Sequence, residues 1–295
     1  MTAPTTKALY RAMFLMALGV FWFSVLDAVT KKLTEGYGTW QISATSRMIT
    51  LTVVLTMILY QHRGVHVLRT SFLVTHMVRS LFVVATTWTF FECLRYLELA
   101  DAIAIAFAAP LFITAMSGPI LGEKVGWRRW SAVVIGFVGV VVALEPGRHG
   151  VSWGALLALI AAITYAIGQL WLRPLAGREQ GHNIIFYATL FSLLIVLGPA
   201  IHEWKWPVNA FDWGLFLVQG SCSTLGQMCM VRAFRVGEAS LLAPFEYTAL
   251  VWAGLFGYLF WGDLPTIQVL VGAAIIIGAS LYIAHREAVK RGAAA

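Results

Sequence analysis

Five charged side chains lie within stretches of this sequence that are otherwise strongly apolar. They are Asp27, Arg47, Arg79, Glu92 and Glu246. A charged group at the centre of a membrane helix costs about 2.5 to 3.5 kcal/mol on insertion scales, so such groups usually face a partner or a water-filled cavity. There they can bind a charged solute or exchange protons. These five residues are therefore the first candidates for solute binding or proton exchange.

Glu246 has the clearest local indication of a function. It follows Pro244 by two residues, and a proline inside a helix frees the backbone carbonyl four residues earlier. Interrupted membrane helices expose such polar backbone at solute-binding sites. We expect Glu246 to recognise a solute or to exchange a proton, and a kink that only aids packing is the alternative.

Arg47 lies deep in its apolar segment, where a lone guanidinium group is costly. We expect it to meet Asp27 or Glu92 across a cavity. Local pairs are the alternative for the two carboxylates. Lys31 follows Asp27 by four residues, a spacing that brings helical side chains together. Arg95 follows Glu92 by three residues in the same way.

Arg79 and three amides have simpler structural explanations. Arg79 lies near the end of its segment, and its long stem allows the charge to reach the headgroups. Gln169, Gln219 and Gln227 lie in apolar segments, where hydrogen bonds between helices contribute about 0.6 kcal/mol on average. We expect these amides to hold helices together, and we retain Gln169 and Gln227 as candidate ligands of a solute.

Aromatic side chains inside the apolar segments can stack on a planar or cationic solute. Most of the 12 tryptophans lie at segment ends instead, which is typical of residues at the membrane interface. Aromatic residues within the segments complete the predicted binding site. Its members are Trp22, Asp27, Arg47, Trp88, Glu92, Phe107, Tyr165, Gln169, Gln227, Glu246 and Tyr247.

The elements that position these residues are membrane helices. The chain is 59% hydrophobic and 12% charged, whereas soluble domains are about 45 to 50% apolar and about 25% charged. A spanning helix needs about 20 mostly apolar residues, and barrel strands would show an alternation that this sequence lacks. We predict an all-α integral membrane protein of ten transmembrane helices. The segments are 9–31, 38–60, 72–96, 100–121, 129–145, 152–172, 183–202, 211–234, 239–261 and 266–285.

One short sequence pattern occurs twice. Arg95 and Arg232 begin the two copies, and Asp101 and Glu238 occupy the same place within them, 137 residues apart in each case. Each copy leads into an Ala-Pro pair and then into a glycine followed by an acidic residue. Five helices per half place the two halves in the membrane with opposite orientation. We expect 1–146 and 147–295 to form two inverted five-helix repeats around a central cavity.

The basic residues indicate the orientation. Fourteen of the 21 Lys and Arg residues lie at helix ends on the side of both termini, and five lie at the opposite ends. By the positive-inside rule we expect both termini in the cytoplasm and the chain in a bacterial-type inner membrane. The net charge of +7 does not indicate nucleic-acid binding, because the basic residues form small groups between apolar segments rather than a patch.

The fourth and ninth segments resemble those of the drug/metabolite transporter superfamily, EamA type. The resemblance spans residues 13–283. It implies ten helices in two inverted repeats and secondary transport of a small organic solute by alternating access. No cofactor is implied, and protons or a counter-substrate could drive the transport. The residues that carry the resemblance are Ala109-Pro110, Ala243-Pro244, Gly122-Glu123, Gly262-Asp263, Gly136, Gly139, Gly272 and Gly278.

Within this superfamily, four stretches look most like the S-adenosylmethionine uptake carriers. They are residues 27–31, Arg47, 76–80 and 243–247. Amino-acid exporters and riboflavin carriers share much of the pattern. The resemblance therefore implies transport, in either direction, of an amino acid or an adenosyl- or aromatic-bearing solute. A multidrug exporter of lipophilic cations and a riboflavin-type vitamin carrier are the alternatives.

Other function classes lack their motifs. The sequence has no His-Glu-x-x-His or comparable motif of an intramembrane enzyme, and His62 and His66 lack a third metal ligand. We expect no enzyme, no metal site and no nucleic-acid partner, and we expect the lipid bilayer and a small-molecule substrate as partners. Small faces suit close helix packing and would equally suit a homodimer. They are formed by Gly118, Gly122, Gly136, Gly139, Gly272 and Gly278.

Overall fold

The computed structural model describes residues 6–62, 68–122, 125–144, 152–172, 175, 178–234 and 239–292. All regular structure within these ranges is helical. The predictions on Glu123, Glu238 and the His62–His66 pair lie wholly or partly outside the described residues. The helices are α1 (Thr6–Thr34), α2 (Thr39–His62), α3 (Leu73–Cys93), α4 (Leu99–Ala106), α5 (Ala109–Leu121), α6 (Trp127–Leu144), α8 (Trp153–Leu172), α9 (Gly181–His202), α10 (Ala210–Phe234), α11 (Ala239–Glu246), α12 (Thr248–Trp261) and α13 (Ile267–Gly292).

Each predicted apolar segment coincides with one helix or with a pair of helices, which confirms the all-helical class. The fourth segment is divided into α4 and α5, and the ninth into α11 and α12. Within the described ranges, seven segments are long and apolar enough to cross a membrane. Of the unbroken helices, α3 and α10 fall outside that set. His76 and Arg79 lower the mean hydropathy of α3, and Ser, Gly and Gln residues lower that of α10. The chain is a multi-pass membrane protein.

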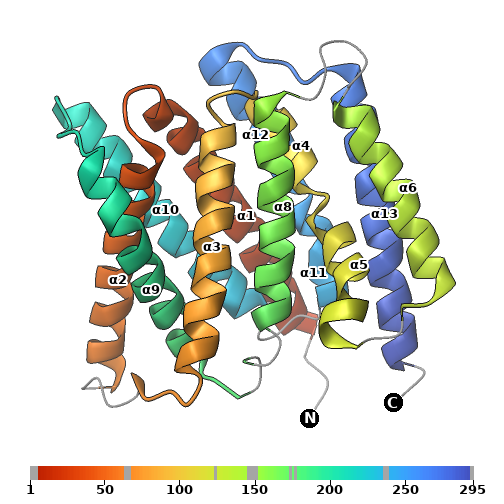
Figure 1. Ribbon diagram of the computed structural model, residues 1–295. Coiled ribbons are helices and arrows are strands. Elements are labelled where there is room, and N and C mark those ends of the chain that lie inside the picture. The colour runs from red at the N-terminus through yellow and green to blue at the C-terminus, as the bar shows by residue number, and fades with distance from the viewer. Residues whose placement is uncertain are drawn as a thin grey trace.

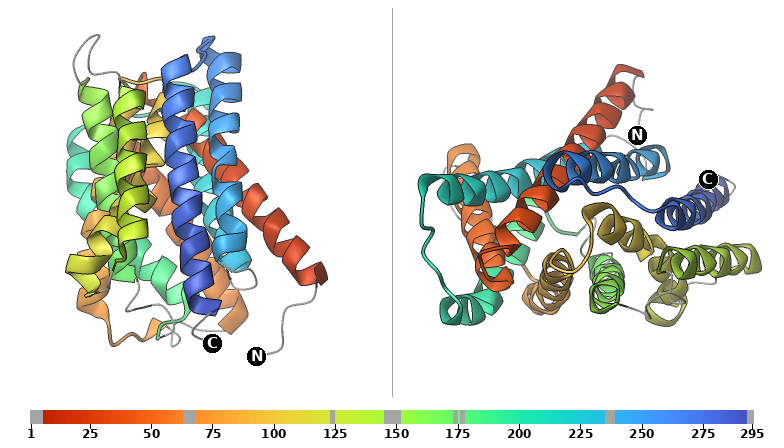
Figure 2. Two further views of the ribbon diagram at one scale, coloured as in Figure 1. Left: turned by 90° about the vertical axis from the view of Figure 1, so that its right-hand side faces the viewer. Right: turned by 90° about the horizontal axis from the view of Figure 1, so that it is seen from above.

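The helices stand side by side in one bundle, and both chain ends lie at its lower end in Figure 1. Helix α1 crosses the bundle at a marked tilt (Figure 2). The most extensive contacts join α1 to α10, α6 to α13, α3 to α8 and α2 to α9. Each of these pairs contains one helix from the first half of the chain and one from the second. The two halves are therefore interleaved and do not form separate units.

The two interrupted helices have matching architecture. Helix α4 gives way to α5 at Phe107 and Ala108, and α11 gives way to α12 at Tyr247. The rings of Phe107 and Tyr247 meet edge to face, with their centroids 5.1 Å apart. Helices α5 and α12 each end at a glycine in the left-handed region, Gly122 at φ 69° and Gly262 at φ 75°. A side chain at either position would strain the backbone.

The two Ala-Pro pairs lie on opposite sides of these breaks. Pro110 lies in the first turn of α5, where a proline removes no helical hydrogen bond. Pro244 lies inside α11, before the break at Tyr247. The sequence pattern presents the two prolines as matching positions, but the structure gives them different roles. Pro110 begins a helix, whereas Pro244 weakens the helix that ends at the break.

Helices α6 and α13 pack backbone against backbone at two glycines. A Cβ atom on Gly272 would lie 2.6 Å from the carbonyl oxygen of Gly139, and one on Gly139 would lie 2.9 Å from the carbonyl oxygen of Gly272. Gly136 accommodates the side chain of Leu111 from α5 in the same way. The predicted close packing is confirmed at these three glycines. A Cβ on Gly122 or on Gly278 would meet no described atom within 4 Å, so the predicted close packing is wrong at these two positions.

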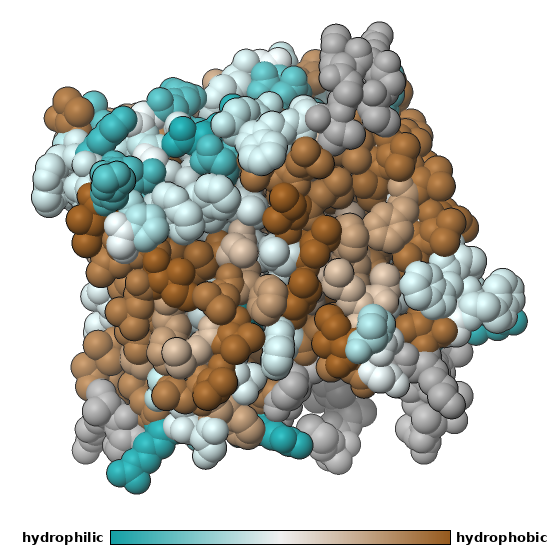
Figure 3. Space-filling model, viewed as in Figure 1, coloured by the Kyte–Doolittle hydropathy of each residue, from teal (hydrophilic) through white to brown (hydrophobic). Residues whose placement is uncertain are grey.

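The outer surface carries a broad apolar band between polar regions at the two ends (Figure 3). Helix α6 contributes Val134, Ile135, Val138 and Val141 to this surface, and each is more than half exposed. Water would not stabilise such a contiguous apolar surface on a monomer. The band is suited to contact with lipid chains.

Candidate functional site

A cavity of about 540 Å³ lies between helices of both halves. Its walls come from α1, α2 and α3 of the first half and from α8, α9, α10 and α11 of the second. Small-molecule sites typically measure about 300 to 1,000 Å³ and combine apolar walls with a few polar groups. This cavity combines phenylalanine and aliphatic side chains with Ser, Thr, Gln and charged residues. Its size and lining suit one small organic solute.

The cavity extends toward the end of the bundle at which both termini lie. Its lining includes Leu172 and Phe234, the last residues of α8 and α10, and both helices end at the lower end of Figure 1. Toward the upper end the lining stops at Ser43 of α2 and Phe91 of α3. The cavity lining therefore reaches the lower ends of α8 and α10.

Arg47 reaches this cavity from α2 and is buried, with only 8% of its surface exposed. Its Nη2 donates a hydrogen bond of 2.7 Å to the hydroxyl oxygen of Thr87 on α3. The Thr87 hydroxyl in turn donates to the carbonyl oxygen of Val83 at 2.8 Å. The Nε atom of Arg47 has no acceptor among the described residues. The contact with Thr87 thus fixes the guanidinium group at the wall and leaves further donors free.

Arg79 lines the same cavity from α3, so the prediction that its charge extends to the headgroups is wrong. Its Nε and Nη1 atoms are buried and meet no acceptor in the described part of the chain. It lies close enough to Arg47 for the two positive charges to interact. The sequence does contain an indication of this position. Val83 and Thr87 follow Arg79 by four and eight residues, a spacing that places all three side chains on one helix face, and all three line the cavity.

Glu246 is the one carboxylate among the described residues of the lining. It is the last residue of α11, directly before the break at Tyr247. Tyr165 of α8 lies within electrostatic range of both Glu246 and Arg79. The Tyr165 hydroxyl oxygen accepts a hydrogen bond of 3.0 Å from Nε2 of Gln169. The second half of the chain therefore supplies a carboxylate, a hydroxyl and an amide to the cavity.

The cavity brings part of the predicted site together. The lining contains Arg47, Tyr165, Gln169, Gln227 and Glu246 from the predicted set. The remaining members lie outside the lining: Trp22, Asp27, Trp88, Glu92, Phe107 and Tyr247. Trp88 stacks on Trp40 with ring centroids 5.1 Å apart, and Trp22 packs in an apolar cluster with Leu26. The sequence did not single out the cavity residues Phe23, Thr87, Phe90 and Phe91.

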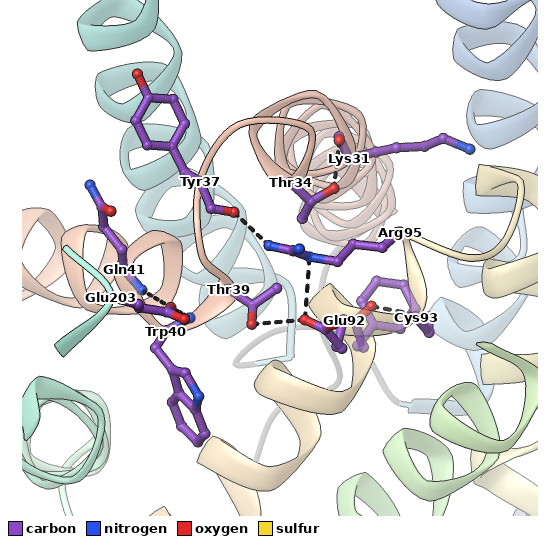
Figure 4. Close-up of polar contacts among 11 residues, drawn as sticks. Lys31, Thr34, Tyr37, Thr39, Trp40, Gln41, Glu92, Cys93, Arg95 and Glu203 are labelled. Carbon is purple, nitrogen blue, oxygen red and sulfur yellow. Dashed lines mark hydrogen bonds and ion pairs between the residues drawn. The ribbon is translucent and has the colours of Figure 1, made fainter. Parts of the chain in front are cut away.

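Glu92 belongs to a polar cluster at the upper end of the bundle (Figure 4). Its Oε2 lies 3.3 Å from Nε of Arg95 and accepts a hydrogen bond of 3.0 Å from the hydroxyl of Thr39. Arg95 also donates to the carbonyl oxygen of Tyr37 at 2.6 Å. The local pair with Arg95 is therefore the one that forms. The described residues show no ion pair between Glu92 and Arg47, because Arg95 is closer to this carboxylate on the same helix end.

Two further contacts join α1 to the end of α12 at the upper end. Lys31 Nζ lies 3.4 Å from Oδ2 of Asp263, and Nε1 of Trp261 donates to Oε1 of Glu35 at 3.1 Å. We call Lys31, Glu35, Trp261 and Asp263 the upper clasp. Within the described ion pairs, Lys31 is bound to Asp263 and not to Asp27, the neighbour that its spacing favours.

Three known transporters are similar to this chain over nearly their whole length. An S-adenosylmethionine uptake transporter of Rickettsia prowazekii is 28% identical, and the alignment covers 91% of this chain and 93% of the relative. A riboflavin transporter of Rhizobium johnstonii is 27% identical, with 96% and 93% covered. A pseudopaline exporter of Pseudomonas aeruginosa is 26% identical, with 92% and 95% covered. All three move small metabolites.

A structural comparison and a family match agree with the similarity to these transporters. A solved crystal structure of 21% sequence identity shares the fold, with a TM-score of 0.66 over 92% of this chain and 96% of that one. The EamA-like transporter family matches the sequence twice, over residues 10–144 and 152–284. The chain therefore belongs to the EamA-like transporter family of the drug/metabolite transporter superfamily, and it is a transporter of small metabolites and not an enzyme.

Proposed function

We propose that this protein is a secondary transporter that carries a small organic metabolite across the inner membrane by alternating access. The observation that carries the proposal is the cavity of about 540 Å³, which has charged groups within an apolar bundle and walls from both halves of the chain. The substrate would bind there. The residues proposed to contact it are Arg47, Arg79, Tyr165, Gln169, Gln227 and Glu246.

Ten transmembrane helices in two inverted repeats, 1–146 and 147–295, are part of this proposal. In this arrangement α1, α2, α3 and α6 of the first half correspond to α8, α9, α10 and α13 of the second. The contact between α1 and α10 then has its counterpart in the contact between α8 and α3, and the contacts α2–α9 and α6–α13 are each their own counterpart. The matching breaks at Phe107 and Tyr247 meet each other, and the family matches each half separately. These observations support an internal two-fold relation. Repeats of this kind have their binding site at the repeat interface.

Alternating access requires the cavity to close on one side and open on the other. The cavity lining reaches the lower end at Leu172 and Phe234, whereas the upper clasp and the Thr39–Glu92 hydrogen bond join helices at the upper end. We assign the lower end to the cytoplasm, because the basic residues favour termini inside. The structure then represents an inward-facing state. Release of the upper clasp would accompany the outward-facing state.

S-adenosylmethionine is our first candidate substrate, because the similar transporter of Rickettsia prowazekii takes it up. Riboflavin is the second candidate, since a similar transporter carries it and aromatic walls suit a flavin ring. An exporter of lipophilic cations that carry no carboxylate is disfavoured, because such a cation offers the two arginines no negative group. Two arginines and one glutamate are the charged residues in the described lining, and like charges at close range cost free energy. A gradient of protons or of a counter-substrate would drive transport.

Counterflow in proteoliposomes tests this function. Purified protein is reconstituted into vesicles preloaded with one unlabelled compound, and entry of the labelled compound is followed without ATP. The panel contains S-adenosylmethionine, riboflavin, L-amino acids and ethidium. We expect saturable counterflow of a metabolite from this panel. Counterflow of ethidium alone would support the cation exporter, and no counterflow of any compound would contradict the proposal.

A further inference from the structure

We propose that the cavity selects solutes that carry a carboxylate, and that this group binds to the guanidinium groups of Arg47 and Arg79. The inference rests on the proposed function, because it names a chemical feature of the substrate of the same cavity. It deepens that function by separating solutes that carry a carboxylate, such as amino acids and their adenosyl derivatives, from solutes without one.

The first support is the unfilled hydrogen-bonding capacity of the two arginines. Thr87 accepts one hydrogen bond from Arg47, whereas Nε of Arg47 and both Nε and Nη1 of Arg79 have no acceptor among the described residues. An arginine side chain offers five N–H donors. A buried donor without an acceptor costs about 1 to 3 kcal/mol, and more when the group is charged. A bound carboxylate would supply the missing acceptors.

The second support is the charge of the cavity. Arg47 and Arg79 carry two positive charges, and Glu246 is the one carboxylate of the described lining. The arginines lie within electrostatic range of each other, and no described ion pair contains either of them. A second positive charge nearby makes each guanidinium group harder to bury. A carboxylate on the solute would offset the positive charge locally at the two arginines.

The choice of arginine at both positions indicates which anionic group binds there. A guanidinium group is planar and presents paired donors that match the two oxygens of a carboxylate. The rest of the wall is apolar or weakly polar, with Phe23, Phe90 and Phe91 on α1 and α3. These rings can accept an aromatic or thioether portion of a solute. The lining therefore fits a solute with an acidic head and a less polar body.

Matched pairs of compounds test the inference by binding, independently of transport. The pairs are S-adenosylmethionine with its decarboxylated analogue, and L-methionine with L-methioninol. The apparent affinity of purified protein for each compound is measured by thermal stabilisation. We expect the wild type to bind the acid of at least one pair about tenfold more tightly than its partner, since a lost charged hydrogen bond of about 1.5 kcal/mol corresponds to that ratio.

Variants then locate the selectivity. Arg47→Gln and Arg79→Gln should weaken binding of the acid and leave the acid-free compound unaffected, so that the preference disappears. Arg47→Lys and Arg79→Lys keep the charge without the planar fork, and they should retain part of the preference if a glutamine variant fails to fold. Arg128→Gln is the control, because Arg128 lies over the Trp127 ring on α6 and outside the cavity. It should bind like the wild type.

The outcomes separate the inference from the proposed function. Equal binding of acid and acid-free compounds by the wild type, or binding of neither acid, would overturn the inference. A preference that survives in both glutamine variants would also overturn it. Acid-selective binding without any counterflow would refute the proposed function and leave the inference intact. Equal counterflow of both members of each pair would support the proposed function and overturn the inference.

Discussion

Lys31 of α1 and Asp263, which follows α12, form an ion pair across the upper end of the bundle, with Nζ 3.4 Å from Oδ2. The two side chains are only 12% and 28% exposed, and they come from opposite halves of the chain. The pair therefore joins the halves at the upper end of the bundle, the side that is closed in the proposed inward-facing state. A partly exposed ion pair of this kind contributes about 0 to 1 kcal/mol, which a gate can break and form again during each cycle.

Loss of this ion pair should expose the cavity to the upper side. Ser46 of α2 lines the cavity. We predict that Asp263→Asn raises the labelling rate of Ser46→Cys by an impermeant thiol reagent added outside. A loss of about 0.5 to 1 kcal/mol corresponds to about two- to fivefold. The background has Cys93, Cys222 and Cys229 replaced by serine. Lys32→Met is the control, because the Lys32–Glu35 pair is exposed and lies within one turn. An unchanged rate in Asp263→Asn would show that the pair does not close the cavity.

Close packing of α6 and α13 should make Gly272 intolerant of a side chain. A Cβ there would lie 2.6 Å from the carbonyl oxygen of Gly139, and a backbone atom cannot move aside cheaply. We predict that Gly272→Ala lowers stability by about 1 to 3 kcal/mol, the usual cost of overpacking, measured as a lower Tm in detergent. Gly278→Ala, on the same helix with open space around it, should leave the Tm unchanged. Equal Tm values for the two variants would contradict the packing described for this interface.

The orientation in the membrane can be tested with single cysteines. We predict that cysteines at positions 64 and 292 react with an impermeant reagent only from the cytoplasm, and that a cysteine at position 150 reacts only from outside. The reason is the excess of basic residues at the ends that share the side of both termini. Labelling of position 150 from the cytoplasm would exclude the inverted-repeat arrangement.

Glu246 should contribute to recognition or coupling and not to folding. We predict that Glu246→Gln keeps the yield and the size-exclusion profile, because the amide is nearly isosteric with the carboxylate. It should lose the pH dependence of uptake if protons drive transport, or the affinity for a cationic group of the substrate if they do not. Uptake is measured between about pH 5.5 and about pH 8, a range of about 2.5 pH units that includes neutrality. An unchanged affinity together with an unchanged pH profile would assign Glu246 a packing role.

The helices could be predicted from the sequence because the bilayer sets their length and composition. Segments of about 20 apolar residues leave few alternatives, and each one corresponds to a helix or to a divided helix. The division of the ninth segment was indicated by Pro244, which lies shortly before the break. The break at Phe107 and Ala108 was not predicted, although Pro110 beside it is suited to a helix start.

The cavity lining could be predicted only in part. A sequence indicates how deep in the membrane a residue lies along its helix, but it does not indicate which face of the helix points into the cavity. Arg47 was expected inside from its depth and Glu246 from its place after Pro244, and both line the cavity. Arg79 and Glu92 lie near opposite ends of α3, but only Arg79 faces the cavity, whereas Glu92 turns to Arg95. Apolar residues on both the lipid side and the interior side leave a weak amphipathic signal. The rotation is then decided by contacts with helices distant in sequence.

Filling the cavity tests most directly whether the substrate passes through it. Ala188 of α9 lines the cavity, and Val138 of α6 faces outward with 54% of its surface exposed. Counterflow of the best wild-type substrate is measured for Ala188→Trp and Val138→Trp in proteoliposomes. We predict that Ala188→Trp lowers the initial rate by about tenfold or more, because the added ring occupies the binding volume, and that Val138→Trp transports like the wild type. Wild-type rate and affinity in a correctly folded Ala188→Trp protein would contradict transport through this cavity.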